Sequence, residues 1–388
     1  MKKVLAVLLG LVLVLGLSSM ALAGDEGFSY SGEFKLQYDS KGFSNPALSL
    51  KSVLTVNLSK TEGDVTAGIS ATIDPLISDT GSGTLKFSPS AYVTINNLFD
   101  TLNLTAASSV GLDVGTISGK GGLTSLPGIK VELVPEVVEG LSAAFVYNTS
   151  SGPAHNLGAS GEFALEGLGK FGGAFAKDDR TSYAIWGSIA PVEGVTAKGE
   201  FDVDGDRQAY FAEAALSGLV EGLSVTAGYE GKNATWGSID DNADVFGIHG
   251  AYYKEREGTV ASNVYATASF ALSETVGLNA GFGYLLSGAQ KGYYVMTAGA
   301  NVTVAEGVTV SGSFAYNSKS AYKLSGSASY VVDKATFAVN ASYSYDNAGN
   351  YEIKPNVTYA FGAGVTGYAE YKLTNTTSGW LVSLGVTF

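Results

Sequence analysis

The chain lacks the residues that most catalytic and metal sites use. Among 388 residues there is no cysteine, and the 2 histidines are His155 and His249. The absence of cysteine excludes disulfide bonds, a thiol nucleophile and a histidine–cysteine metal cluster. A serine hydrolase would need one histidine beside a serine and a third orienting group. We therefore expect no catalytic, cofactor-binding or metal-binding residues, and we expect that the protein is not an enzyme.

Basic residues are also scarce. Lys and Arg total 23 against 36 Asp and Glu, which gives a formal net charge of −13. This acidity argues against nucleic acid as a partner. The 51 glycines, 22 tyrosines and 18 phenylalanines are typical of strands that pack closely, and this aromatic content argues against disorder.

Long apolar runs are missing except at the start of the chain. Residues 2–3 are lysines, residues 4–17 are apolar and residues 21–23 read Ala-Leu-Ala. This order predicts a secretory signal peptide over residues 1–23 and a mature chain over residues 24–388. The apolar stretch is shorter than the ~20 residues that a spanning helix needs. Any further contact with a membrane must therefore use strands.

Alternation of apolar and small polar residues runs through the whole mature chain. Clear examples are Phe28–Tyr38, Tyr322–Val332, Thr336–Tyr345, Tyr351–Tyr359 and Thr377–Phe388. A period of two predicts strands with one apolar face, and no stretch sustains a period near 3.6. Because this alternating pattern does not change along the chain, one continuous sheet explains the pattern more simply than several two-sheet sandwiches do.

A turn signature recurs at nearly constant spacing. Glu-Gly pairs occupy 139–140, 166–167, 193–194 and 221–222, so the glycines lie 27 or 28 residues apart. Residues 306–307 and 62–63 repeat the pair, and Asp333-Lys334 and Gly362–Gly364 stand where the next members would fall. The unit fits two strands of ~10 residues, one tight turn and one loop. Glycine permits the positive backbone angles that such turns need.

The repeat also decides the number of strands. A direct count gives an odd number, whereas bacterial barrels have an even number. We count strands forward from Phe28 and backward from Phe388. The two counts conflict between Lys232 and Gly258. If this segment is one long loop, about 22 strands remain, with 20 and 24 as alternatives. The sequence therefore predicts an all-β fold, a single antiparallel transmembrane β-barrel with up-and-down topology over residues 24–388.

Two loops are candidates for special roles. We expect the loop at Lys232–Gly258 to fold into the lumen and narrow it, and the alternative is an ordinary surface loop. Its charged residues include Asp240, Asp241, Asp244, Lys254 and Arg256. A stretch rich in Gly and Ser at Gly111–Leu126 is the second candidate loop.

If the apolar face meets lipid, the polar face lines a water-filled lumen. The charged residues that we single out in that phase are Glu33, Lys35, Lys51, Lys198, Glu200, Asp202, Asp204, Lys323, Glu352, Lys354, Glu370 and Lys372. Both signs occur, so the wall favours cations weakly at most. The alternative is that some of these charges are paired and only hydrate the wall.

Aromatic residues recur at strand ends, just before polar loops. They are Tyr38, Tyr147, Tyr229, Tyr284, Tyr316, Tyr345 and Tyr371. Tyrosine and tryptophan girdles flank the apolar band of membrane barrels, although aromatics also favour strands in general. We prefer the girdle interpretation because the position within the strand repeats.

The chain ends Leu384-Gly385-Val386-Thr387-Phe388. With the N-terminal signal and the alternating hairpins, this ending resembles the bacterial outer-membrane porins and related β-barrel proteins, as an architecture and not as one porin family. The resemblance implies a location in the bacterial outer membrane, passive diffusion of ions and small hydrophilic solutes, and assembly into homo-oligomers, often trimers. It also implies contact with outer-membrane lipid and recognition of the C-terminal strand, with Phe388 last, by the barrel-assembly machinery.

Two other classes of protein remain open. A non-conducting structural or adhesive barrel predicts bulky residues in the inward phase, where Ser, Gly, Thr and Ala dominate. A barrel enzyme predicts a histidine beside a serine or a carboxylate at the rim. A barrel of about 22 strands is too wide for small side chains to fill, so the sequence favours an open pore.

Overall fold

The computed structural model describes residues 33–41, 45–77, 85–114, 121–134, 138–149, 155–178, 180–218, 220–233, 261–288, 291–346, 348–362 and 364–387. These residues form 22 β-strands, and no helix among them is long and apolar enough to cross a membrane. The strands are β1 (Glu33–Lys41), β2 (Asn45–Glu62), β3 (Val65–Ile77), β4 (Leu85–Leu98), β5 (Leu102–Val114), β6 (Gly121–Leu133), β7 (Leu141–Thr149), β8 (His155–Leu165), β9 (Gly169–Lys177), β10 (Thr181–Val192), β11 (Val195–Asp204), β12 (Arg207–Ser217), β13 (Leu223–Lys232), β14 (Ala261–Ser273), β15 (Val276–Ser287), β16 (Tyr294–Ala305), β17 (Val308–Asn317), β18 (Tyr322–Val332), β19 (Ala335–Asp346), β20 (Ala348–Gly362), β21 (Val365–Thr374) and β22 (Ser378–Thr387).

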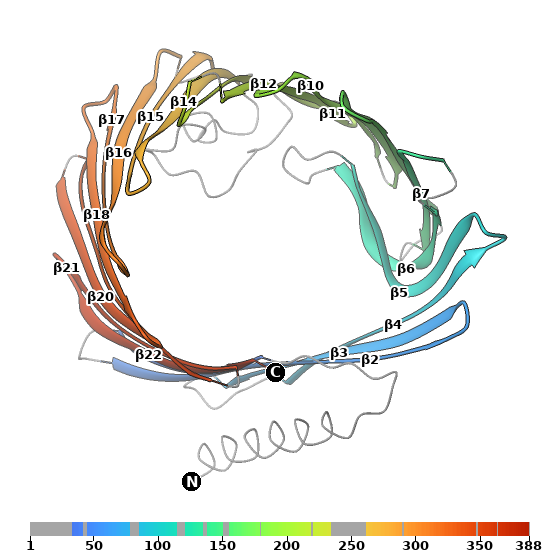
Figure 1. Ribbon diagram of the computed structural model, residues 1–388. Helices are drawn as coiled ribbons and strands as arrows, with labels where there is room; N and C mark the ends of the chain where they lie inside the picture. Colours follow the sequence, from blue (N-terminus) through green and yellow to red (C-terminus); the bar gives the residue numbers. More distant parts are fainter. Residues whose placement is uncertain are drawn as a thin grey trace, which may run out of the picture.

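The strands make one antiparallel up-and-down sheet. Each strand pairs with its neighbour along the chain, from β1–β2 to β21–β22. The last strand also pairs with the first, with Glu33 opposite Thr387 and Leu36 opposite Leu384. The sheet thus returns to its own start, and Figure 1 shows it wrapped around a central space. The predicted fold class and the predicted number of about 22 strands are confirmed.

The expected long connection does join two neighbouring strands. β13 ends at Lys232 and β14 begins at Ala261, and these two residues lie opposite each other in the ladder. A single connection therefore spans the segment where the two counts disagreed. Residues 234–260, with Asp240, Asp241, Asp244, Lys254 and Arg256, lie outside the described residues. That this loop narrows the lumen stays a prediction.

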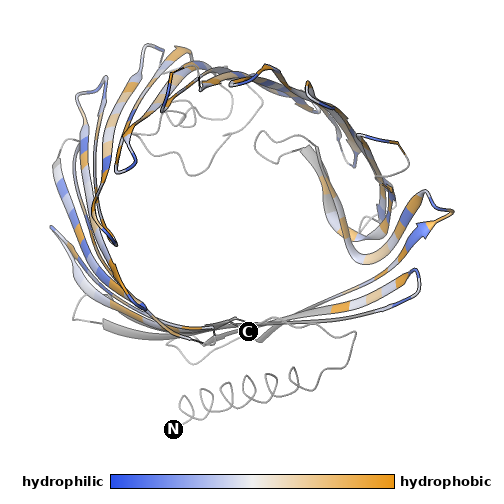
Figure 2. Ribbon diagram, in the orientation of Figure 1, coloured by the Kyte–Doolittle hydropathy of each residue, from blue (hydrophilic) through white to orange (hydrophobic). Residues whose placement is uncertain are grey.

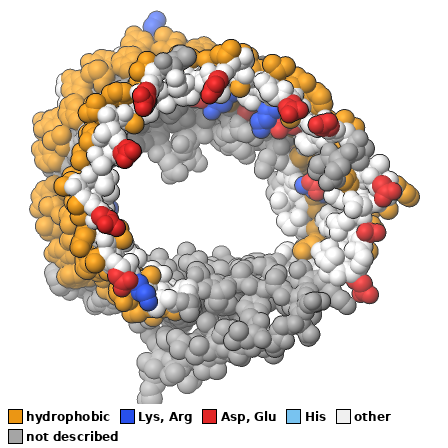
Figure 3. Space-filling model, viewed as in Figure 1, with side chains coloured by type: hydrophobic (Ala, Val, Ile, Leu, Met, Phe, Trp, Pro, Cys, Tyr) orange, Lys and Arg blue, Asp and Glu red, His pale blue; other side chains and the backbone are white. Residues whose placement is uncertain are grey.

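The alternating pattern sorts side chains onto two faces. The predicted strands near the C-terminus coincide with β18, β19, β20 and β22, while Phe28–Gly32 and Phe388 lie outside the described residues. Large apolar side chains point outward and stay exposed, as Ile185 (61%) and Val304 (65%) do. Figure 3 shows the same division, with apolar side chains around the outside and many charged side chains toward the inner rim, and the ribbon in Figure 2 alternates between hydrophobic and hydrophilic residues along the strands.

The Glu-Gly turns lie together at one end of the barrel, here called the short-turn rim. At Gly63, Gly140, Gly167, Gly194, Gly222 and Gly307, φ lies between +60° and +77°. Asp333 (φ 50°) and Gly364 (φ 76°) occupy the places predicted for the next members. The sequence repeat therefore marks one turn per hairpin, and the other connections form the opposite end, the loop rim.

Backbone hydrogen bonds link nine of the short turns to the next hairpin. The carbonyl of Gly194 accepts a bond from the Ser217 amide at 2.6 Å, and that of Gly307 accepts one from Val331 at 2.8 Å. The same arrangement joins Asp64 to Asn96, Thr101 to Val134, Gly140 to Ala164, Leu168 to Ala190, Gly222 to Ala271, Thr275 to Thr303 and Lys334 to Ala360. The short-turn rim is thus a belt of interlocked turns whose carbonyls are satisfied.

We predict that two similar glycines of this belt respond differently to substitution. A β-carbon at Gly194 would overlap with the Ser217 carbonyl, whereas one at Gly167 would meet nothing within 4 Å. Gly167→Ala should cost about 1–2 kcal/mol for its positive φ, and Gly194→Ala about 1–3 kcal/mol more for the collision. Urea unfolding of the refolded protein in lipid measures both. Equal losses would show that the neighbouring strand end yields freely.

Candidate functional site in the lumen

The predicted charged residues share the inward face wherever their side chains are described. Lys198, Glu200, Asp202 and Asp204 alternate along β11 with outward residues such as Phe201. Lys323 on β18, Glu352 and Lys354 on β20, and Glu370 and Lys372 on β21 follow the same phase. For Glu33, Lys35 and Lys51 the structure gives only the register, in which Lys35 lies opposite both Lys51 and Gly385.

One part of the inner wall is lined by hydroxyl groups beside paired charges. Glu352 contacts Lys354 at 2.5 Å and Lys372 at 2.7 Å. Next to it, Ser311, Ser313, Ser325, Ser327, Asn340 and Lys323 help to line a shallow pocket of about 260 Å³. The hydroxyls of Ser311 and Ser327 lie 2.7 Å apart. This wall presents water with many neutral donors and acceptors, and with charges that are largely compensated.

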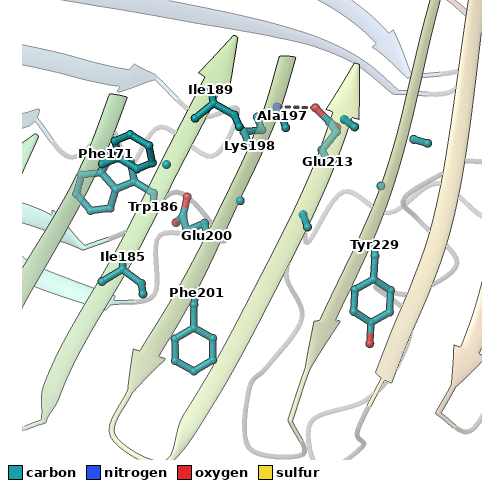
Figure 4. Close-up of a pocket in the computed structure, with 16 residues that line it drawn as sticks. Phe171, Ile185, Trp186, Ile189, Ala197, Lys198, Glu200, Phe201, Glu213 and Tyr229 are labelled. Atoms are coloured by element: carbon teal, nitrogen blue, oxygen red, sulfur yellow. Dashed lines mark ion pairs between the residues drawn. The ribbon is translucent and has the colours of Figure 1, made fainter. Parts of the chain in front are cut away.

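Across the lumen, β8 to β14 carry a second set of charges that the sequence analysis did not single out. Glu162 accepts hydrogen bonds from Trp186 at 3.0 Å and Lys170 at 3.3 Å. Glu213 pairs with Lys198 at 2.8 Å and accepts a bond from Tyr265 at 2.6 Å. Figure 4 shows the Lys198–Glu213 pair beside Trp186 and Glu200. Glu162 and Glu213 lie in the polar phase of their strands, and this position in the sequence pattern could have identified them as lumen residues.

Asp204 ties three strands together at the loop rim. Its carboxylate accepts a hydrogen bond from Ser182 at 2.8 Å and lies 3.5 Å from Arg180 and 3.4 Å from Arg207. These partners come from β10, the turn before it and β12. Asp204 is therefore buried among partners, so its charge is compensated locally. Among the described residues, no group of three or more His, Asp or Glu is placed to hold a metal ion.

Part of the β5–β6 hairpin leaves the wall and enters the lumen. We call Ser108–Val114 together with Gly121–Leu126 the inner hairpin. Pairing of β4 with β5 stops at Tyr92 opposite Ala107, and β6 pairs with β7 only from Gly128 onward. The two strands of the inner hairpin stay paired with each other. Figure 1 shows β5 and β6 curving into the central space.

This geometry corrects one prediction. Gly111–Leu126 was expected to be a loop, but its described residues are paired strands, with Leu112 opposite Leu123 and Val114 opposite Gly121, and residues 115–120 lie outside the described residues. Gly111 serves close packing, because a β-carbon there would lie 2.8 Å from the Leu123 carbonyl. The register of β5 and β6 shifts twice between Ala107 and Leu112, which bends the hairpin. Glycine and serine thus mark a bulged, tightly packed hairpin.

The inner hairpin is held against the wall by apolar contacts. Val110 (5% exposed) and Leu123 (5%) cluster with Val146 (0%) from β7. The same cluster contains Ala174, Ala176 and Ala184, with Ala107, Leu112 and Trp186 packed around it. The Asn148 amide donates a hydrogen bond to the Val110 carbonyl at 2.7 Å. Apolar residues in the inward phase of β7, β9 and β10 thus find a cover inside the lumen.

We predict that a side chain at Gly158 loosens the inner hairpin. A β-carbon there would lie 2.7 Å from Leu112 Cδ2 and 3.1 Å from Leu123 Cδ1. Gly161, on the other face of β8, has only one neighbour, at 3.6 Å, and is the matched control. Gly158→Val should cost about 1–3 kcal/mol of hairpin packing.

The measurement is maleimide labelling of a reporter cysteine placed at buried Val110. Gly158→Val should speed labelling by about tenfold per ~1.4 kcal/mol lost, and Gly161→Val should leave the rate unchanged. Equal rates in both variants would mean that β8 does not support the hairpin.

Comparisons with known proteins identify the fold and no family. No model of a known protein family matches the chain, and no curated protein matches it in sequence. The siderophore receptor PirA from Pseudomonas aeruginosa superposes with a TM-score of 0.54 at 12% identity, over 94% of this chain and 81% of that one.

Two further solved structures are similar at lower scores. The translocation pore of the P pilus usher PapC has a TM-score of 0.45 at 10% identity, over 93% of this chain and 99% of that one. OccAB2 from Acinetobacter baumannii has a TM-score of 0.44 at 10% identity, over 93% and 97%. The likeness to the PirA receptor, together with the closed antiparallel sheet, shows that the chain has the fold of bacterial outer-membrane β-barrel proteins.

Proposed function

We propose that this protein is an outer-membrane porin that lets ions and small hydrophilic solutes diffuse passively through its lumen. The observation that carries the proposal is the inverted polarity of the sheet. Apolar side chains cover the outside, while Ser, Thr, Asn and charged residues line the inside. In Figure 3 the described side chains border an open space. An apolar surface of this extent needs lipid, and a polar interior needs water.

Aromatic pairs on the outer face support the membrane position. Tyr322 stacks on Tyr345 with ring centroids 5.5 Å apart, and Tyr371 lies 4.8 Å from Trp380. Tyr294 and Tyr316 form a similar pair at 6.5 Å. All of them lie near the strand ends at the loop rim. Such rings have an apolar body and a polar tip, so they suit the boundary between lipid and water.

Export and assembly are parts of the same proposal. A signal peptide over residues 1–23 delivers the chain across the inner membrane, and the C-terminal strand with Phe388 is read by the barrel-assembly machinery. β22 is the strand that closes the sheet by pairing with β1. The mature protein contacts outer-membrane lipid and associates as a homo-oligomer.

Single-channel recording tests the channel. The mature protein, refolded and inserted into a planar lipid bilayer, should give stable current steps with weak selectivity for cations. A folded, inserted protein without conductance would reject the porin and favour a structural or adhesive barrel. The closed sheet would survive that result, because circular dichroism and resistance to protease report folding independently.

We predict opposite shifts of ion selectivity from two neighbouring wall residues. Glu352→Gln leaves Lys354 and Lys372 without their shared carboxylate, so the reversal potential in a salt gradient should move toward anions. Lys354→Gln should move it toward cations. Lys334→Gln, in the turn between β18 and β19, is the control and should change nothing. Identical potentials in all three variants would place this wall outside the ion path.

A further inference from the structure

The inner hairpin leaves behind a strand edge of matching length. Beyond Tyr92 and Ala107, β4 continues back to Leu85 and β5 continues to Val114. Continuing the same register pairs Ala91 with Ser108 and, at the far end, Leu85 with Val114. The unused parts of the two strands therefore end together. Among the described strands, residues 85–89 pair with β3 on one side and with none on the other.

The separation of the two strands begins at an identifiable bond. The Ala91 amide points toward β5, but it donates to the side-chain oxygen of Ser108 at 2.8 Å instead of continuing the backbone ladder. Ser108 is the residue opposite Ala91 in the continued register. Its hydroxyl thus satisfies the amide at the point where backbone pairing stops. The hinge of the inner hairpin therefore lies between Ala107 and Val110, where the register of β5 and β6 also shifts.

We propose that the inner hairpin is a gate with two seats. In the inward seat, seen in the structure, it lies on the lumenal face of β7 to β10. In the outward seat it completes the barrel wall by pairing with residues 85–91 of β4, which widens the lumen. This inference rests on the proposed channel function and assigns its regulation to one element.

The two seats use different interactions, so their balance responds to different changes. The inward seat buries Val110 and Leu123 on apolar wall residues. The outward seat supplies backbone partners for the β4 edge, and its register brings Lys86 opposite Asp113. Pro89 has no amide hydrogen, so the outward ladder lacks one bond. That missing bond keeps the outward seat weaker than a regular ladder and the inward seat accessible.

Cysteine cross-links test the proposal cleanly because the chain has no native cysteine. Leu112→Cys with Gly158→Cys locks the inward seat, since replacing Leu112 removes the methyl group that lies 2.7 Å from a β-carbon at 158. Lys86→Cys with Asp113→Cys locks the outward seat, because the continued register places these residues opposite each other, well beyond the hinge. Ser88→Cys with Asp113→Cys is the control, two residues out of register.

Cross-link yield and single-channel conductance are measured together, before and after reduction. We expect both locking pairs to oxidise and the control pair to stay reduced. The outward lock should raise the conductance and the inward lock should lower it, and reductant should reverse both changes. These results would support the gate.

Other outcomes separate the gate from the channel. An outward pair that never oxidises, or two locks with equal conductance, would overturn the gate while leaving the channel intact. Formation of both disulfides with no current in any form would reject the channel but retain the two seats.

Discussion

The structure depends on one requirement, that the sheet closes so that its first and last strands find backbone partners. Pairing of β1 with β22 meets this requirement for the first and last strands, because it leaves neither of them as a sheet edge. Once the sheet is a ring, the side-chain period of two allows only two environments, outside and inside. The apolar residues of the mature chain take the outside, so the polar residues define a lumen. Fold and candidate site are thus two consequences of the same closure.

The short-turn rim and the loop rim differ in how much their connections can vary in length and composition. At the short-turn rim, a carbonyl in nine of the turns accepts a hydrogen bond from an amide at the end of a neighbouring strand, which fixes turn length and demands positive φ at positions such as Gly194. At the loop rim, Asp204 gathers Ser182, Arg180 and Arg207 through its side chain, and among the described residues fewer backbone bonds, such as that from Gly205 to Thr181, link the hairpins there. Side-chain contacts tolerate changes in length and composition that a backbone belt does not. We therefore expect the loops at the loop rim to vary more in length and composition than the short turns, and with them the access of solutes to the lumen.

Sequence reasoning succeeded where the signal is local. The Glu-Gly spacing located the turns, and the alternation in Thr336–Tyr345 located a strand and its two faces. The conflict between the strand counts from the two ends of the chain located the long connection after Lys232. It failed at Gly111–Leu126, because glycine and serine suggest a loop and nothing local shows that Leu123 packs on Val146. It also passed over Glu162 and Glu213, whose partners lie on other strands. Contacts between distant strands follow from curvature of the ring, which a period of two does not encode.

The inner hairpin shows how an exception to the pattern carries information. In the inward phase of β7, β9 and β10 stand Val146, Ala174, Ala176 and Ala184, where serine or a charged residue is the rule elsewhere. Apolar residues facing water in a lumen gain nothing from lipid, so they need a cover within the protein. Val110 and Leu123 supply it, and Gly158 gives them room. An apolar patch in the polar phase of a barrel strand therefore indicates that another part of the chain folds into the lumen and covers the patch. Strands whose backbone pairing stops early, as in β5 and β6, are the candidates for that cover.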